Sequence, residues 1–128
     1  MKANSAVSDA FKLIRDHGLN SVGVVHEDNG QLIGNISASD LKVVGLTGEL
    51  FGRMLLSCRQ YLTLIPTNPN FTYPISVNPS TTVEELIKKF DIAHVHRIYV
   101  VDNQQMPVGI VSVYDLLKAL KEDVENLE

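Results

Sequence analysis

Two seven-residue stretches combine a glycine, a serine and an aspartate at the same spacing. The first reads GNISASD, from Gly34 to Asp40, and the second reads GIVSVYD, from Gly109 to Asp115. Each follows an apolar run and continues into leucine, which is typical of a strand that gives way to a helix. A helix start gathers free backbone N–H groups and positive potential, which suits phosphates and hydroxyls. An aspartate there can also accept hydrogen bonds from a sugar diol.

The same spacing also describes a helix cap that holds no ligand. In a capping box, a serine and an acid three residues later each satisfy a free backbone N–H group at the helix start. The two pairs are Ser37 with Asp40 and Ser112 with Asp115. One such pair alone is more often a cap, worth roughly 1 kcal/mol, than a site. The glycine before each serine favours a ligand, because glycine weakens a strand and often marks a close approach. A cap and a site do not exclude one another.

The two motifs belong to two copies of an internal repeat. Residues 7–25 align with residues 83–101, and both segments place apolar residues three and four apart, which predicts an amphipathic helix. A β-branched pair then predicts a strand in each copy, Val24–Val25 and Val100–Val101. A turn-forming loop, a second strand (LIGNIS or PVGIVS) and a closing helix follow. Each copy is therefore predicted to be helix, strand, strand, helix.

The segments before and between the copies differ. A strand-like lead, Tyr73 to Pro79, precedes the second helix, whose N-cap is expected within Ser80–Thr82. Only Met1 to Ser5 precede the first helix, so its lead strand is missing or the chain is a fragment of a longer one. Between the copies, Leu50 to Cys58 predicts one amphipathic helix, which the prolines of IPTNPNF then end.

The predicted fold class is α/β (α+β), with two pseudo-symmetric units that each pack two helices on a small sheet. The expected boundaries are 1–48 for the first repeat, 49–72 for a helical linker and 73–128 for the second repeat. Neither repeat can bury both faces of its sheet alone, so the two are expected to share one core.

Composition excludes several classes of protein. The 128 residues are 45% hydrophobic and 20% charged, which is typical of a globular chain, and the net charge of −4 gives no basic field for nucleic acid. No apolar run approaches the roughly 18 residues of a membrane span, and the N-terminus lacks an apolar signal core. The sequence predicts a soluble protein, cytoplasmic or nuclear, that binds neither nucleic acid nor membrane.

The duplicated motif with its flanks resembles a CBS domain, and two such units resemble a CBS pair (Bateman module). The second copy, HVHRIYVVDNQQMPVGIVSVYDLLKAL, is similar to a CBS unit of the gamma subunit of AMP-activated protein kinase. The resemblance covers the chain except for the linker. It implies a regulatory module that binds an adenine nucleotide (AMP, ADP or ATP) or a related adenosyl ligand in the cleft between repeats, without chemistry on the ligand.

The resemblance also implies which residues bind. The motif Asp and Ser contact ribose and phosphate, and the residue after the glycine lies against the adenine. For the second motif these are Asp115, Ser112 and Ile110, with Tyr114 beside them; for the first they are Asp40, Ser37 and Asn35.

Each site is expected to borrow residues from the opposite copy. Ser5, Leu19 and Asn20 would complete the Asp115 site, and Thr81, Val95 and His96 would complete the Asp40 site. His96 and Arg97 also match the pair that reaches the phosphates in the gamma-type pattern, and an arginine fork suits a phosphate. The first copy has Asn20 and Ser21 at these places and supplies no such cations.

Other chemistries find little support in the sequence. His94 and His96 have no third clear ligand for a metal ion. No Gly-x-Ser-x-Gly elbow appears, and GNISASD lacks the lysine of a P-loop. The expected protein is not an enzyme and uses no cofactor. Its expected partners are a second copy, further CBS repeats or a regulated protein. The alternative is an interaction scaffold with no nucleotide, whose motifs only cap helices.

Overall fold

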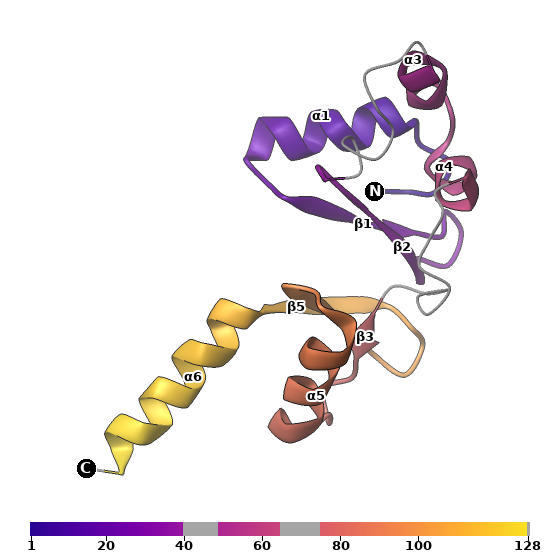
Figure 1. Cartoon of the computed structure of the whole chain (residues 1–128). Coiled ribbons are helices and arrows are strands. Elements are labelled where there is room, and N and C mark those ends of the chain that lie inside the picture. The colour runs from indigo at the N-terminus through magenta and orange to yellow at the C-terminus, as the bar shows by residue number, and fades with distance from the viewer. Residues whose placement is uncertain (40–48, 65–74, 128) are drawn as a thin grey trace. The chain divides into compact units, whose positions relative to one another are not determined.

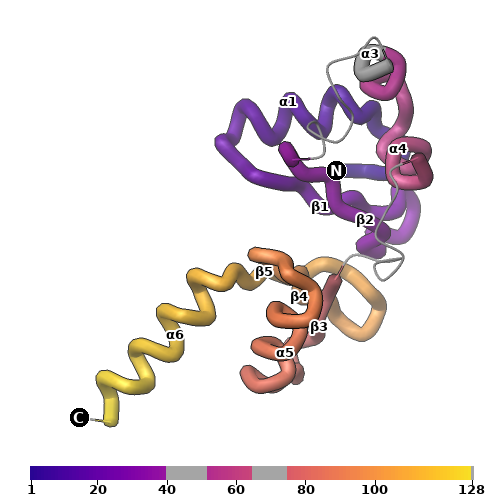
Figure 2. Tube along the Cα trace, in the orientation of Figure 1, coloured from indigo at the N-terminus to yellow at the C-terminus, as the bar shows by residue number. Residues whose placement is uncertain are grey.

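The computed structural model describes residues 1–39, 49–64 and 75–127. The chain divides into two compact units, Met1–Pro74 and Ile75–Glu128. Both mix helices with a small sheet, as expected for the α/β (α+β) class (Figures 1 and 2). None of the described helices is long and apolar enough to cross a membrane.

The first unit packs helices against a two-stranded antiparallel sheet. Helix α1 (Val7–His17) precedes strands β1 (Ser21–Val25) and β2 (Leu32–Ser37), and the short helices α3 (Glu49–Met54) and α4 (Cys58–Leu64) follow. Helix α1, the sheet and α4 all contribute to the core, whose buried residues include Ala10, Ile14, Val22, Val24, Ile36, Cys58 and Tyr61. The helix and both strands predicted for residues 7–37 are confirmed. The closing helix predicted after them lies outside the described residues.

The lead strand of the first repeat is present as a single pairing. Lys2 pairs in parallel with Val25, and the flanking bonds join Ala3 N to the oxygen of Val25 at 2.8 Å and Val25 N to the oxygen of Met1 at 2.9 Å. In the second unit Ser76 and Val77 pair in parallel with Tyr99 and Val100. An isolated parallel pairing therefore stands where the sequence predicts a short or missing lead strand.

The linker forms two helices, so the single helix predicted from Leu50 to Cys58 is wrong. Residues 55–57 leave the helical path, because Val7 N bonds the oxygen of Leu56 at 2.9 Å and Cys58 N bonds the oxygen of Ser5 at 2.8 Å. Ser57 then caps α4 in a capping box with Gln60. Long-range backbone bonds to the segment before α1 thus override the helical periodicity.

The second unit is a three-stranded sheet with two helices. Its elements are β3 (Ser76–Val77), α5 (Val83–Ala93), β4 (Arg97–Val101), β5 (Pro107–Ser112) and α6 (Val113–Asn126). Strand β4 lies in the middle, parallel to β3 and antiparallel to β5. Val77, Phe90 and Ile98 form the buried core, and α6 continues directly from the end of β5 (Figure 1). The predicted N-cap is confirmed: Thr82 caps α5 in a capping box with Glu85.

The two motif glycines have different neighbours. A Cβ atom at Gly34 would overlap the side chain of Leu62 on α4, whereas one at Gly109 would meet only Val100, at 3.8 Å. The close approach that a strand glycine often marks is therefore made in the first unit by a linker helix. Packing against Leu62 is therefore sufficient to explain Gly34, and this glycine does not by itself indicate a ligand at the first motif.

The repeats also differ at two left-handed backbone positions. Gly18 (φ 61°) ends α1 and Gly30 (φ 74°) lies in the β1–β2 turn, where glycine is unstrained. His94 (φ 52°) and Gln105 (φ 65°) hold the equivalent places in the second repeat. They are the non-glycine residues with positive φ in the described ranges, and each costs roughly 1–2 kcal/mol of strain.

Substitution of Gly34 should reveal its contact with α4. Gly34→Ala is expected to destabilise the first unit by about 1–2 kcal/mol, because Leu62 must move to admit the new methyl group. Urea unfolding measures this, with Gly109→Ala as the matched control of near-zero effect. Adding Leu62→Ala should reduce the penalty of Gly34→Ala, so strictly additive effects would contradict the contact.

Relief of the strain at the end of α5 should stabilise the protein. His94→Gly is expected to raise the free energy of unfolding by roughly 0.5–1 kcal/mol, because the relieved strain exceeds the added freedom of the unfolded chain. Gly18→Ala, at the equivalent end of α1, should act in the opposite direction. A loss of stability in His94→Gly would show that the imidazole makes contacts that outweigh the strain.

Candidate functional site

The antiparallel pairing of β4 and β5 places the second motif on one face of the sheet. Arg97 lies directly opposite Ser112, and Tyr99 lies directly opposite Ile110. Ile98, between Arg97 and Tyr99, is fully buried in the core. Because side chains alternate along a strand, Arg97, Tyr99, Ile110 and Ser112 all lie on the face away from that core. We call these four residues the outer ladder.

The start of α6 adjoins the end of the outer ladder. Ser112 is the N-cap: its Oγ accepts from Asp115 N at 3.0 Å, and its own N–H donates to Asp115 Oδ2 at 2.9 Å. Val113 N also donates to the oxygen of His96 at 3.0 Å, which ties the helix start to the segment before β4. The capping interpretation of the second motif is confirmed, and the cap sets the Asp115 carboxylate beside the strand pair.

We call the start of α6 with the adjoining Arg97–Ser112 pair the α6 corner. Its hydrogen bonds and charges favour the ionised form of Asp115. The backbone N–H of Ser112 is the largest cause that holds the pKa of the Asp115 carboxyl below its usual value, followed by the Ser112 hydroxyl and then by the positive charges of Lys118 and Arg97. The Asp115 residue is exposed to solvent. The corner combines one anionic acceptor, a positive helix end and two nearby cations.

Two residues here were not selected from the sequence. Tyr99 shares the outer ladder with Arg97, and strand alternation from Arg97 would have identified it. Lys118 follows Asp115 by three residues on α6, so helical spacing places the two side chains on the same face. Neither belongs to the Gly-x-x-Ser-x-x-Asp pattern, so that pattern alone does not identify them.

The first unit has fewer functional groups at the positions equivalent to the outer ladder. Ser21 lies opposite Ser37, and Gly23 lies opposite Asn35, so the equivalent positions carry neither a cation nor an aromatic ring. The Ser37 hydroxyl lies 2.7 Å from that of Ser39. Asp40 is outside the described residues, so the predicted pairing of Asp40 with Ser37 stays a prediction.

The residues expected to serve the opposite copy lie at the two ends of α1 and of α5. Leu19, which is 43% exposed, and Asn20 lie where β1 begins, and the Asn20 oxygen accepts from Ala38 N at 2.9 Å. Ser5 lies before α1, and the helix of 11 residues between it and Leu19 spans about 16 Å. The second unit repeats this arrangement: α5 separates Thr81 from Val95 and His96.

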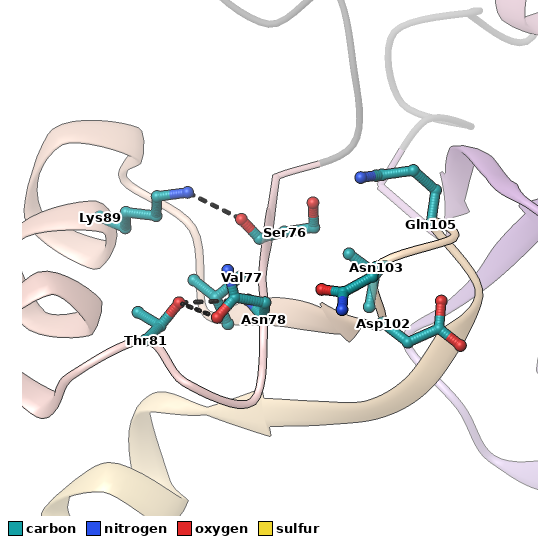
Figure 3. A pocket seen from close by; sticks show the side chains of 9 residues that line it. Ser76, Val77, Asn78, Thr81, Lys89, Asp102, Asn103 and Gln105 are labelled. Carbon is teal, nitrogen blue, oxygen red and sulfur yellow. Dashed lines mark hydrogen bonds between the residues drawn. The ribbon is translucent and has the colours of Figure 1, made fainter.

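Thr81 instead lines a polar cavity of about 300 Å³ at the turn end of the second sheet (Figure 3). Several of the residues that line this cavity already form hydrogen bonds within the second unit. Lys89 Nζ donates to the oxygen of Ser76 at 2.8 Å, and Asp102 Oδ1 accepts from the backbone N–H groups of Gln104 and Met106. The cavity lies at the end of β4 away from Arg97, so it is separate from the motif.

A possible metal-ligand set lies in the β1–β2 loop. His26, Glu27 and Asp28 are the one group of three such side chains close enough to share an ion within the described ranges. Glu27 Oε2 already pairs with Arg59 at 2.8 Å, and Asp28 N donates to His26 Nδ1 at 3.2 Å. These bonds account for the cluster, so we assign no metal to it.

Removal of the Ser112 hydroxyl should change the titration of Asp115. Because the folded-state pKa of Asp115 is lowered, its ionised form stabilises the fold above its usual pKa, and this contribution is lost as the pH falls through the folded value. Ser112→Ala should raise that pKa towards its usual value and cost about 1 kcal/mol of stability for the lost cap. Carboxyl NMR titration tests this. An unchanged Asp115 pKa would contradict the contribution of the hydroxyl, because the bond from the backbone N–H of residue 112 remains in the variant.

Comparison with known proteins identifies the family. The CBS domain family model matches residues 2–45 and 71–122. The Arabidopsis thaliana SNF1-related protein kinase regulatory subunit gamma-1-like is 25% identical over 132 residues, which cover 98% of this chain and 30% of the relative. The subunit gamma-like PV42a of the same plant is 31% identical over 131 residues, with 91% and 36% covered. The chain spans about a third of the length of these relatives.

Solved structures agree on the fold. CBSX2 in complex with AMP has a TM-score of 0.72 at 22% identity and covers 95% of this chain and 86% of that one. The CBS domain of a bacterial CNNM/CorC family Mg²⁺ transporter in complex with ATP has a TM-score of 0.68 at 22% identity, with 94% and 76% covered. The predicted CBS pair and its likeness to gamma subunits are thereby confirmed. The chain belongs to the CBS domain family and carries the CBS unit twice.

Proposed function

We propose that the second unit binds an adenine nucleotide (AMP, ADP or ATP) or a related adenosyl compound as a regulatory ligand. The observation that carries the proposal is the pairing of Arg97 with Ser112 beside Asp115 at the start of α6. Similar chains support it, since CBSX2 is described in complex with AMP and the CNNM/CorC CBS domain in complex with ATP. The ligand is bound without any chemical change.

Each polar group has a role that follows from its chemistry. The Asp115 carboxylate accepts hydrogen bonds from the ribose hydroxyls, because it is ionised and exposed. Arg97 and His96 attract the phosphates, with the positive end of α6 adding to their field. Ile110, which is 48% exposed, offers an apolar surface to the base. Tyr114 lies beside Asp115 in the first turn of α6 and is 73% exposed.

The contributions expected from elsewhere in the chain remain predictions from the family resemblance. Leu19 and Asn20, which follow α1, are exposed, and Ser5 and Thr81 precede α1 and α5. The first motif has the weaker claim to a nucleotide, because Asn35 and Gly23 replace the pair formed by Ile110 and Tyr99.

Regulation would act through differential binding. A nucleotide that prefers one arrangement of the protein shifts the population towards it by no more than that preference. Helix α6 begins at the proposed site and exposes apolar side chains along its length, at Leu117, Leu120 and Val124. We propose this stripe as the surface that a second copy, further CBS repeats or a regulated protein would contact, in a complex that the nucleotide biases.

Loss of the Asp115 carboxylate should abolish most of the binding. In calorimetric titrations with AMP, ADP and ATP, Asp115→Ala is expected to weaken affinity about 10-fold or more, because charge-assisted hydrogen bonds are lost. Glu85→Ala is the matched control, since Glu85 is the equivalent acid in the capping box of α5. It loses the same kind of cap but should bind nucleotide as the original chain does.

Two results would contradict the proposal. One is equal weakening in both variants, which would assign the effect to lost capping. The other is a folded chain that releases no heat with any of these nucleotides at millimolar concentration. The scaffold alternative would then be favoured, on the exposed stripe of α6, and sedimentation velocity would show whether the chain self-associates.

A further inference from the structure

We infer that Tyr99 contacts the base of the ligand and, with Ile110, makes the second unit selective for compounds that carry an aromatic base. The inference rests on the proposed function. It names the residue that recognises the base end of the ligand.

The strand register carries the inference. Tyr99 and Ile110 are direct partners across β4 and β5, so their Cβ atoms lie about 4.5–5.5 Å apart on the same face. That face is opposite the core, because Ile98 is fully buried and Val100 packs against the same core cluster. A phenol ring and a half-exposed isoleucine side by side form a flat apolar surface, which suits the face of a purine.

The outer ladder also indicates which end of the ligand would lie on which pair of residues. Arg97 and Ser112 form the next pair on the same face, two residues along each strand, so the two pairs are about 7 Å apart. A ribose separates the base of a nucleotide from its 5′-phosphate by a comparable span. With the phosphate at Arg97 and the positive end of α6, the base falls on Tyr99 and Ile110, and Asp115 lies beside the ribose.

Aromatic character matters more than apolar area here. A tyrosine ring stacks on the π-face of a base, and removal of such a ring lowers affinity several-fold or more. An aliphatic side chain of similar bulk retains burial but cannot stack in this way. The first unit has Gly23 opposite Asn35 at this place, so base recognition distinguishes the two motifs although both retain Gly and Ser.

The test compares a ligand that has a base with one that lacks it. Three proteins are titrated with AMP: the original chain, Tyr99→Phe and Tyr99→Leu. Each is also titrated with ribose 5-phosphate, alone and in competition with AMP. Tyr99→Phe should keep the preference for AMP over ribose 5-phosphate. In Tyr99→Leu the ratio of AMP affinity to ribose 5-phosphate affinity should fall about 10-fold. AMP should bind more weakly, and the affinity for ribose 5-phosphate should be unchanged.

A fluorescence readout keeps the inference testable if Tyr99→Leu does not fold. The chain has four tyrosines and no tryptophan, so tyrosine dominates its intrinsic emission. AMP should quench part of that emission in the original chain, and Tyr99→Phe should lose this part while still binding AMP.

The outcomes separate the inference from the proposed function. An unchanged AMP preference in Tyr99→Leu, or full quenching in Tyr99→Phe, would overturn the role of Tyr99 while nucleotide binding stands. Equal loss of affinity for both ligands in Tyr99→Leu would also overturn it, because a structural role for the ring predicts that result. If the original chain binds neither AMP nor ribose 5-phosphate, the proposed function itself fails.

Discussion

The register of β4 against β5 is the constraint on which the candidate site depends. It sets Arg97 against Ser112 and Tyr99 against Ile110, while Ile98 and Val111 face the core. A slip of one residue would exchange the faces, bury a cation and expose Ile98. The cost of burying an unpaired charge makes that alternative unfavourable, so the same burial that stabilises the sheet also aims the polar residues outward.

The cap of α6 and the proposed site use the same atoms in compatible ways. Asp115 satisfies the Ser112 N–H through Oδ2, and that bond fixes the carboxylate beside the strand pair. Its pKa is lowered chiefly by this bond and then by the Ser112 hydroxyl, so the group stays anionic without any ligand. The sequence already allows one motif to serve as both cap and site, and in the second unit the cap is what positions the acceptor.

The repeat, its helices and strands and the caps at Thr82 and Ser112 were predictable, because they depend on residues close in sequence. The break between α3 and α4 was not, since it depends on bonds from residues 56–58 to residues 5–7. The role of Gly34 likewise required the position of Leu62. The assignment of Ser5 and Thr81 to the ligand sites follows from the family resemblance alone and stays a prediction. Tyr99 could have been selected from strand alternation alone.

The two repeats differ in the residues that they place at equivalent positions. The first uses glycine at both left-handed positions and fills the space over Gly34 with Leu62, so its choices favour packing. The second accepts strain at His94 and leaves Ile110 and Tyr114 exposed, which stability alone does not favour. Strain and exposed apolar side chains are common where binding sets the residue choice. His94 lies just before β4, at the end of that strand where Arg97 is found. The backbone strain at His94 therefore lies close in sequence to the proposed binding residues Arg97 and His96.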